Sequence, residues 1–290
     1  MSTRILFGAA CGLTLALAST AWSATVPMPA GSSPESLSIT PGGDIIVGSS
    51  TAPKIYKIKK GSTKAEPWID LSADGPKGSV LGVLADPGHK TLWACQILDG
   101  QPGAGRKTAL RGFDLDSGAP KSRWNLPGET NLCNDLAIGP DGFAYVTDTF
   151  AGRIWKVGPD GKDGTLVVEG LNLGGADGIA FLGAKLYVNT VFPGNLYRID
   201  IGADGKGKTE EIWMDRLVRN PDGMRAMGGK LLVAENAAGR ISTLTITGEK
   251  AHVTTVKTGL KTPTAMQAAD RQIWIANRAA DEVLSVPLPK

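Results

Sequence analysis

The segment CNDLAIGPDGFAYVTDT, residues 133–149, contains the pattern that decides the fold. An alternating apolar stretch around Leu136 and Ile138 comes first, a Pro-Asp-Gly turn follows at residues 140–142, and a second apolar stretch continues through Tyr145. Alternation with a period of two is typical of half-buried strands, and Pro, Asp and Gly favour tight turns. The segment therefore predicts a β-hairpin.

The same hairpin pattern recurs along the chain. The related segments are PESLSITPGGDIIVGSS (34–50), GSVLGVLADPGHKTLWAC (78–95), ADGIAFLGAKLYVNT (176–190), PDGMRAMGGKLLVAEN (221–236) and PTAMQAADRQIWIAN (263–277). Matching positions are 43 residues apart from Asn134 to Asp177, 45 from Asp177 to Asp222, and 42 from Asp222 to Thr264. A strand-rich repeat of this period is typical of a β-propeller with one blade per repeat.

Two more strands follow each hairpin, such as residues 153–157 and 165–169 in the third repeat. Six repeats of this kind predict an all-β, six-bladed β-propeller with four-stranded antiparallel blades, formed by residues 25–290 as one domain. The 38 glycines and 18 prolines agree with many tight turns. Residues 202–209, GADGKGKT, match a phosphate-binding loop by letter, but the repeat places them in a hairpin turn between the third and fourth strands.

The net charge of +3 is small for 290 residues and favours neither nucleic acid nor a membrane surface as a partner. Arg4, the apolar run at residues 5–17 and the small residues before Ala24 predict a signal peptide over residues 1–24. We therefore expect an exported protein, periplasmic or secreted, that is monomeric and free of the membrane after cleavage.

Two cysteines, Cys95 and Cys133, remain after the signal peptide and its Cys11 are removed. Both are expected at the same mouth of neighbouring blades, so a disulfide is feasible in an oxidising compartment. Two separate buried thiols are the alternative, because spacing alone does not fix the distance between the residues.

Polar residues occupy the same point of four repeats, namely Glu35, Asn134, Asp177 and Asp222. Equivalent positions of successive blades converge on the propeller axis, so these side chains are expected to face one another. Three ionised acids around one channel would repel, and a bound divalent cation would remove that conflict. Oxygen ligands favour calcium, with manganese and magnesium as alternatives and zinc not excluded. The competing interpretation is that Asp and Asn only cap turns, although Glu35 is a poor turn former.

Three segments carry a resemblance to the senescence-marker-protein/gluconolactonase/regucalcin-like family of calcium-dependent hydrolases, over residues 30–290. They are Pro34-Glu35-Ser36, Asn134-Asp135-Leu136 with the turn that follows it, and Pro221-Asp222-Gly223-Met224 with the strand at residues 230–234.

The resemblance implies a six-bladed propeller with one axial metal, bound by a Glu of the first blade, an Asn of the fourth and an Asp of the fifth. The corresponding residues are Glu35, Asp177 and Asp222, so an Asp replaces the Asn. Asn134 then corresponds to a third-blade residue that contacts substrate, or metal through water. Leu132 stands where sugar-lactone enzymes of the family often have an Arg, which argues against an anionic or highly hydroxylated sugar lactone.

The resemblance implies metal-dependent hydrolysis of a small-molecule lactone or related ester, with Asp222 as general base and the cation polarising the carbonyl. Residues at the ends of second strands are expected to edge the same mouth and to contribute to substrate binding; they are Asp148, Asn189, Glu235, Asn236 and Asn277. Two alternatives stay open. One is a non-catalytic exported propeller that binds a ligand or protein around a structural metal, and the weaker one is a strictosidine-synthase-like reaction.

Overall fold

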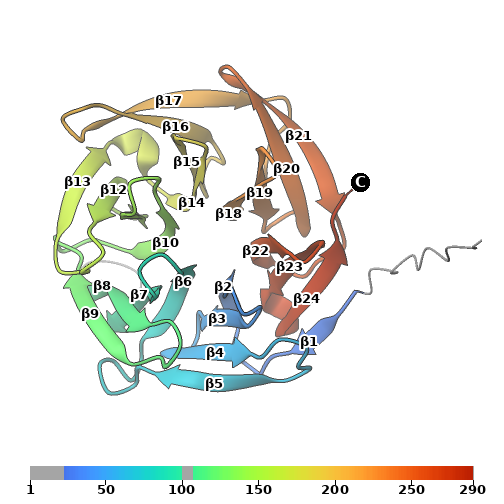
Figure 1. Ribbon diagram of the computed structural model, residues 1–290. Coiled ribbons are helices and arrows are strands. Elements are labelled where there is room, and N and C mark those ends of the chain that lie inside the picture. Colours follow the sequence, from blue (N-terminus) through green and yellow to red (C-terminus); the bar gives the residue numbers. More distant parts are fainter. Residues whose placement is uncertain (1–22, 100–106, 290) are drawn as a thin grey trace, which may run out of the picture.

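The structure, a computed structural model, describes residues 23–99 and 107–289 and is built almost entirely of strands (Figure 1). The short 3₁₀-helices of this part of the chain are η1 (Leu171–Leu173) and η2 (Arg278–Ala280). Sheets of mainly antiparallel strands are arranged around a common centre, and the strand that begins each group of four lies nearest that centre (Figure 1). The predicted all-β, propeller-like architecture is therefore confirmed.

Three of the sheets are formed by consecutive strands in sequence order. The first contains β2 (Pro34–Ile39), β3 (Ile45–Ser49), β4 (Lys54–Ile58) and β5 (Ala65–Asp70). The second contains β6 (Ser79–Asp86), β7 (Thr91–Asp99), β8 (Lys107–Asp114) and β9 (Pro120–Asn125). The third contains β10 (Cys133–Ile138), β11 (Ala144–Asp148), β12 (Arg153–Val157) and β13 (Gly164–Glu169).

The next eight strands form one sheet in the described chain, where two separate sheets were expected. One half contains β14 (Ala176–Leu182), β15 (Lys185–Thr190), β16 (Leu196–Ile201) and β17 (Gly207–Met214). The other contains β18 (Pro221–Met227), β19 (Lys230–Glu235), β20 (Arg240–Thr247) and β21 (Lys250–Lys257). The halves join where Trp213 and Met214 of β17 pair in parallel with Lys250 and Ala251 of β21. This pairing satisfies backbone groups at the outer edges of β17 and β21.

The last sheet joins the two ends of the described chain. It contains β22 (Pro263–Ala269), β23 (Gln272–Asn277), β24 (Glu282–Pro287) and β1 (Thr25–Pro27). Strand β1 pairs antiparallel with β24, with Val26 opposite Val283. The ring is thus closed by a strand from the beginning of the chain, a choice that the sequence left open.

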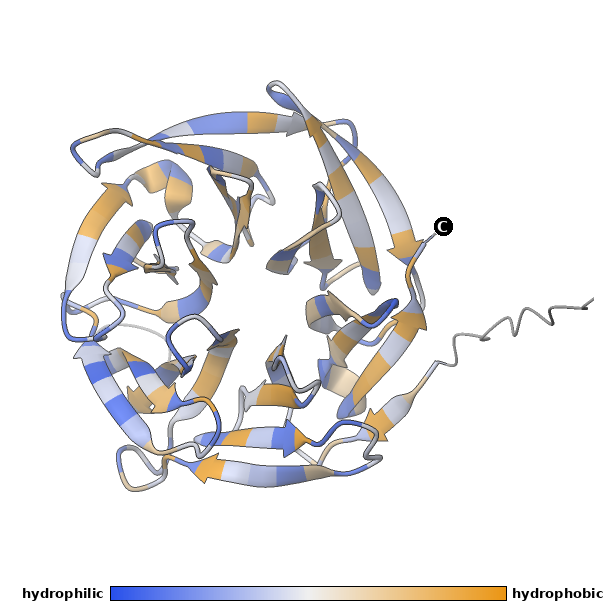
Figure 2. Ribbon diagram, in the orientation of Figure 1, coloured by the Kyte–Doolittle hydropathy of each residue, from blue (hydrophilic) through white to orange (hydrophobic). Residues whose placement is uncertain are grey.

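Buried apolar side chains fill the spaces between neighbouring sheets, as expected when each sheet is hydrophobic on both faces. Hydrophobic and hydrophilic residues alternate along the strands, and the outermost strand β9 is largely hydrophilic (Figure 2). Successive side chains of a strand point to opposite faces of the sheet, so they face different neighbouring sheets. Residues 202–209 contain the turn between β16 and β17, with Gly202 N donating to Lys206 O at 2.8 Å, so they form the predicted hairpin.

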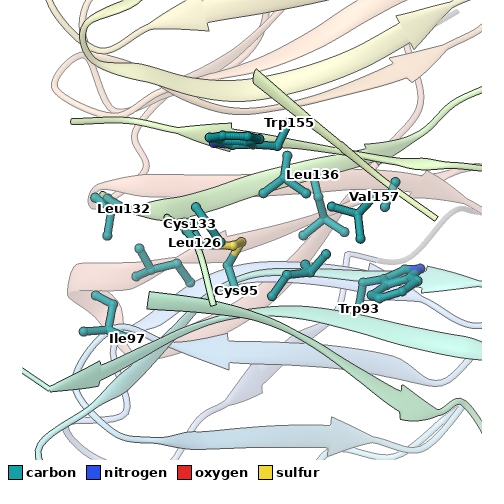
Figure 3. Close-up of a cluster of buried hydrophobic side chains, with 13 residues drawn as sticks. Trp93, Cys95, Ile97, Leu126, Leu132, Cys133, Leu136, Trp155 and Val157 are labelled. Atoms are coloured by element: carbon teal, nitrogen blue, oxygen red, sulfur yellow. A yellow bond between two sulfur atoms is a disulfide. The ribbon is translucent and has the colours of Figure 1, made fainter. Parts of the chain in front are cut away.

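A disulfide joins Cys95 of β7 to Cys133 of β10, with the Cα atoms 5.1 Å apart. It lies inside the apolar cluster between the second and third sheets, near Leu126 and Leu136 (Figure 3). The bond links neighbouring sheets, so it ties two repeats together at their cores.

The expected signal peptide falls outside the described residues except for positions 23 and 24. Among the described residues there is no helix with the length and apolar character needed to cross a membrane.

Candidate functional site

A β-bulge near the start of each inner strand positions the predicted site residues. The register between the first and second strands shifts between Pro34 and Leu37, and it shifts at the matching points of the other inner strands. Each shift adds one residue to the inner strand, and bulges of this kind re-aim side chains. The residues inside the shifts include Glu35, Asn134, Asp177, Asp222 and Thr264.

Glycines beside these residues let the inner strands approach one another closely. A Cβ atom on Gly178 would lie 2.4 Å from the carbonyl oxygen of Asp222, and one on Gly223 would lie 2.8 Å from the carbonyl oxygen of Thr264. Any side chain there would push neighbouring inner strands apart. The recurring Asp-Gly pair therefore has two functions, because the Asp supplies a carboxylate and the Gly lets the next strand come close.

The bulged residues meet around one small cavity, called here the acid cavity. Its volume is about 10 Å³, and its lining includes Glu35, Asn134, Asp135, Asp177 and Asp222. A cavity of this size is about the minimum for one water molecule, and it is far too small for an organic substrate. The predicted convergence of these four repeat positions is therefore found in the structure.

Burial raises the pKa of the three cavity acids, Glu35, Asp177 and Asp222, above its ordinary value. The charges of Asp135 and Glu35 raise the pKa of Asp177 further. The charges of Asp177 and Glu35 do the same for Asp222. Mutual effects of this kind require short distances, so the three acids interact as one cluster with an excess of negative charge.

Arg278 supplies positive charge to this cluster. Its Nη1 donates to Glu35 Oε2 at 2.7 Å, and its charge lowers the pKa of each of the three cavity acids. Burial and mutual repulsion outweigh that effect, so the net direction stays upward. Asn236 also acts on the cluster, because its Nδ2 donates to Asp222 Oδ2 at 2.9 Å.

A buried ion pair borders the acid cavity on its inner side. Asp135 of β10 accepts from Arg225 of β18 through both oxygens, at 2.8 and 3.0 Å. Arg225 also lines a larger, mostly apolar cavity of about 270 Å³, formed with residues near the opposite ends of β6, β10, β14 and β18. The pair therefore lies between the two cavities, so a substrate would reach the three cavity acids from the end where the inner strands begin.

The residues at the ends of second strands are engaged within the fold. Asp148, predicted to bind substrate, is fully buried and accepts from Leu132 N at 2.8 Å and from Arg153 Nη2 at 2.7 Å. Its carboxylate is thus occupied, and it does not line the acid cavity. Glu235 is likewise fully buried against two arginines. Of this predicted set, Asn236 donates to the carboxylate of a cavity acid, and Asn189 Nδ2 donates to the backbone carbonyl oxygen of Asp222 at 2.8 Å.

The acid cavity offers the oxygen donors expected of the predicted metal site. Three carboxylates and one amide are the donor types that calcium and magnesium bind, and the cavity has the size of a single ion. Within residues 23–99 and 107–289, however, no group of three or more His, Cys, Asp or Glu side chains is arranged so that it could hold a metal ion. The donor atoms are of the kind that binds a divalent cation. Their positions are those of a cavity in which Arg278 is bound to Glu35.

Sequence reasoning missed Asp135, Arg225 and Arg278. Asp135 follows Asn134 directly, and a second polar residue in a buried inner strand was a signal that this segment faces the axis. Arg278 follows the end of β23, whose last residue Asn277 pairs with Pro263 at the start of β22. That register brings position 278 to the edge where the site residues lie.

No protein-family model and no curated protein matches this sequence. Solved structures do resemble the fold. A gluconolactonase from Xanthomonas campestris is 15% identical, with a TM-score of 0.67 over 92% of this chain and 90% of that one. Virginiamycin B lyase from Staphylococcus aureus is 14% identical, with a TM-score of 0.64 over 92% and 99%.

The aldose sugar dehydrogenase from Streptomyces coelicolor, bound to PQQ, is 15% identical, with a TM-score of 0.65 over 92% of this chain and 99% of that one. The three proteins carry different activities on a similar scaffold. At these identities the likeness shows the fold alone, and function has to be argued from the site.

Proposed function

We propose that this protein is an exported hydrolase that opens a lactone or related ester beside a divalent cation held by Glu35, Asp177 and Asp222. One observation carries the proposal. Carboxylates from three inner strands, β2, β14 and β18, share an ion-sized cavity with too little positive charge to balance them. The gluconolactonase with a similar fold supports the choice of reaction, as does the resemblance noted from the sequence.

The proposal includes a six-bladed reading of the fold. We treat the eight-stranded sheet as two blades, β14–β17 and β18–β21, joined at their outer edges by two residue pairs. Six buried apolar clusters in the described residues support this reading, because each lies between neighbouring groups of four strands. The acids then come from the first, fourth and fifth blades, as the resemblance implies.

Calcium is our first choice of cation because it accepts irregular coordination by oxygen atoms and water. When bound, the cation would supply Lewis-acid polarisation of the carbonyl oxygen. The residues of the chain would do the rest. Glu35 and Asp177 would hold the ion, and Asn134 would orient the substrate at the mouth, since the cavity itself has no room for it.

Asp222 is our choice for the general base. In the cation-free protein its pKa is raised first by burial and then by the charges of Asp177 and Glu35, and these effects would oppose the loss of basicity that a bound cation causes. In the reaction, Asp222 would take a proton from water as the water oxygen bonds to the carbonyl carbon. The ring C–O bond then breaks, and the proton passes to the leaving oxygen to give a hydroxy acid.

Export agrees with the disulfide between Cys95 and Cys133, because such bonds persist in oxidising compartments. We therefore expect the mature protein in the periplasm or outside the cell, acting on a small molecule rather than on nucleic acid.

The test combines metal content with turnover. Purified protein should carry about one equivalent of a divalent cation, and it should hydrolyse members of a lactone panel of differing ring size and charge. Treatment with a chelator should abolish hydrolysis, and calcium or manganese should restore it. Turnover that survives complete chelation would contradict the metal-dependent mechanism. A bound cation without turnover of any lactone would instead support a non-catalytic binding propeller with a structural metal.

A further inference from the structure

Arg278 is held in place on the rim of the acid cavity. It begins η2, and its side chain contacts Glu35 of β2 in the neighbouring sheet. Its backbone N donates to Thr262 O at 3.0 Å, and its backbone O accepts from Asp281 N at 3.1 Å. The guanidinium reaches Glu35; the side chain of Arg278 is 30% exposed and that of Glu35 is 11% exposed. A fixed backbone and a partly exposed head leave the side chain room to turn toward solvent.

The charge of Arg278 matches a departure in the acid set. The ligands implied by the resemblance carry two negative charges, because the fourth-blade position is an Asn. Here Asp177 adds a third. Arg278 adds one positive charge and interacts with all three cavity acids, which returns the cluster to the charge of the implied set.

We propose that Arg278 is a built-in counter-ion of the acid cavity, which compensates for Asp177 and competes with a divalent cation for Glu35. The proposal rests on the cation site argued above and adds a regulatory feature to it. It also explains why the acids share a cavity yet do not form a ligating group. One oxygen of Glu35 is already bound to the guanidinium, so a cation that takes both oxygens has to displace Arg278, and a cation that takes the other oxygen meets the positive charge of Arg278.

A simpler role would be structural. Arg278 and Glu35 belong to the last and first sheets, so their ion pair could act as a clasp at ring closure. The two roles predict different couplings. If the ion pair only holds the first and last sheets together, loss of Arg278 should lower stability equally with Asp or Asn at position 177. A counter-ion would be needed less once Asp177 becomes neutral, because the repulsion that it offsets is then smaller.

The experiment is a double-mutant cycle with wild type, Asp177→Asn, Arg278→Met and the double variant. Thermal unfolding of chelated protein is measured first. Arg278→Met should lower Tm, and Asp177→Asn should raise Tm more in the Arg278→Met background than in wild type. Additive changes in Tm would overturn the counter-ion role. Arg198→Met, which removes a guanidinium from Asp200 and Glu210 on outer strands, is the control and should not couple to Asp177→Asn.

Cation affinity is the second readout, measured by titration calorimetry with calcium chloride and with manganese chloride. Arg278→Met should bind the cation about 10-fold more tightly than wild type, a common size for coupling between two bound groups. The cation affinity of Arg278→Lys, which keeps the charge but not the planar guanidinium, should lie between those of wild type and Arg278→Met. Equal or weaker binding by Arg278→Met would overturn the competition. If none of the proteins binds either cation, the proposed function and the competition both fail, while the Tm cycle still decides the counter-ion role.

Discussion

Two groups of buried carboxylates in this protein differ in how their charge is balanced. Asp148 and Glu235 end second strands, their side chains are fully buried, and each has arginine partners. The three cavity acids lie one strand nearer to the axis and share one arginine. Both groups belong to equivalent edges of the same repeat, so position alone does not explain the difference.

Glu235 and Asp222 also differ in the direction of their pKa shifts. Burial by itself would raise the pKa of Glu235, but hydrogen bonds from Arg216, Ser242 and Arg240 outweigh it and hold the pKa below its ordinary value. For Asp222, burial combines with repulsion and the pKa rises. A buried carboxylate with full partners serves the fold, whereas buried carboxylates without enough partners are candidates for chemistry.

The largest effect on stability is expected when a balanced carboxylate is neutralised. Glu235→Gln keeps the volume but removes the charge that faces Arg216 and Arg240. Losing one partner of a buried ion pair typically costs 3–5 kcal/mol; because these arginines are partly exposed, we expect a loss of about 3 kcal/mol. Urea denaturation would measure it. Asp177→Asn is the contrasting substitution and should stabilise the chelated protein, so equal losses in both variants would remove the distinction between the groups.

The next effect concerns turnover. Asp222→Asn should reduce kcat at least about 100-fold, a loss of ~2.7 kcal/mol, because the amide cannot accept the proton. The protein should remain folded, since the substitution also removes repulsion from the cavity. Steady-state kinetics on the best lactone of the panel would show this, with Asp200→Asn on the outer strand β16 as control. Unchanged turnover would mean that Asp222 is not the base.

The sequence allowed the inner-strand residues to be predicted because a propeller repeats one hairpin around an axis. A shared register is enough to infer that Glu35, Asn134, Asp177 and Asp222 converge, and each lies in a bulge of its own inner strand. For the second-strand ends the same register is not enough, and their role in substrate binding stays a prediction. Their register places Asp148 and Glu235 near the mouth, but register does not tell whether an arginine already occupies them.

The arginine partners could not be predicted because they depend on contacts between repeats. Arg225 pairs with Asp135, which lies 90 positions earlier in the sequence. Arg278 pairs with Glu35, which lies 243 positions earlier. Such pairs form only when the ring closes, and no local period relates their positions. The contact between β17 and β21 is similar, since it depends on how far two outer strands extend.

A smaller effect is expected in the pH dependence of stability. Because the pKa values of Asp177 and Asp222 are raised in the folded state, the unfolded chain loses these protons first as pH rises from about 4. Their contribution to stability is therefore complete at low pH and is lost as pH rises toward the folded pKa values. The loss is about 1.4 kcal/mol for each unit by which a pKa is raised.

Comparison of chelated wild type with Asp177→Asn isolates this contribution from that of other acids. The urea midpoint should fall more steeply with pH in wild type than in Asp177→Asn. A range of about pH 4.5 to 8.5 covers roughly four pH units above the ordinary pKa of Asp. Saturating calcium should remove most of the difference, because a bound cation favours the ionised acids. Parallel pH profiles would show that Asp177 is already balanced in the folded protein.

The smallest expected effect concerns the single hydrogen bond from Asn236 to Asp222. Asn236 Nδ2 donates to Asp222 Oδ2 at 2.9 Å, and this bond lowers the pKa of Asp222 against the effects of burial and repulsion. Asn236→Ala should therefore raise that pKa and move the acid limb of the kcat/KM profile upward by about 1 unit. Asn195→Ala, which removes a hydrogen bond to Tyr197 of β16 rather than to a cavity acid, should leave the limb in place. An acid limb that does not move in Asn236→Ala would assign it to a group other than Asp222, since the carboxylate that controls turnover must respond to its own hydrogen-bond donor.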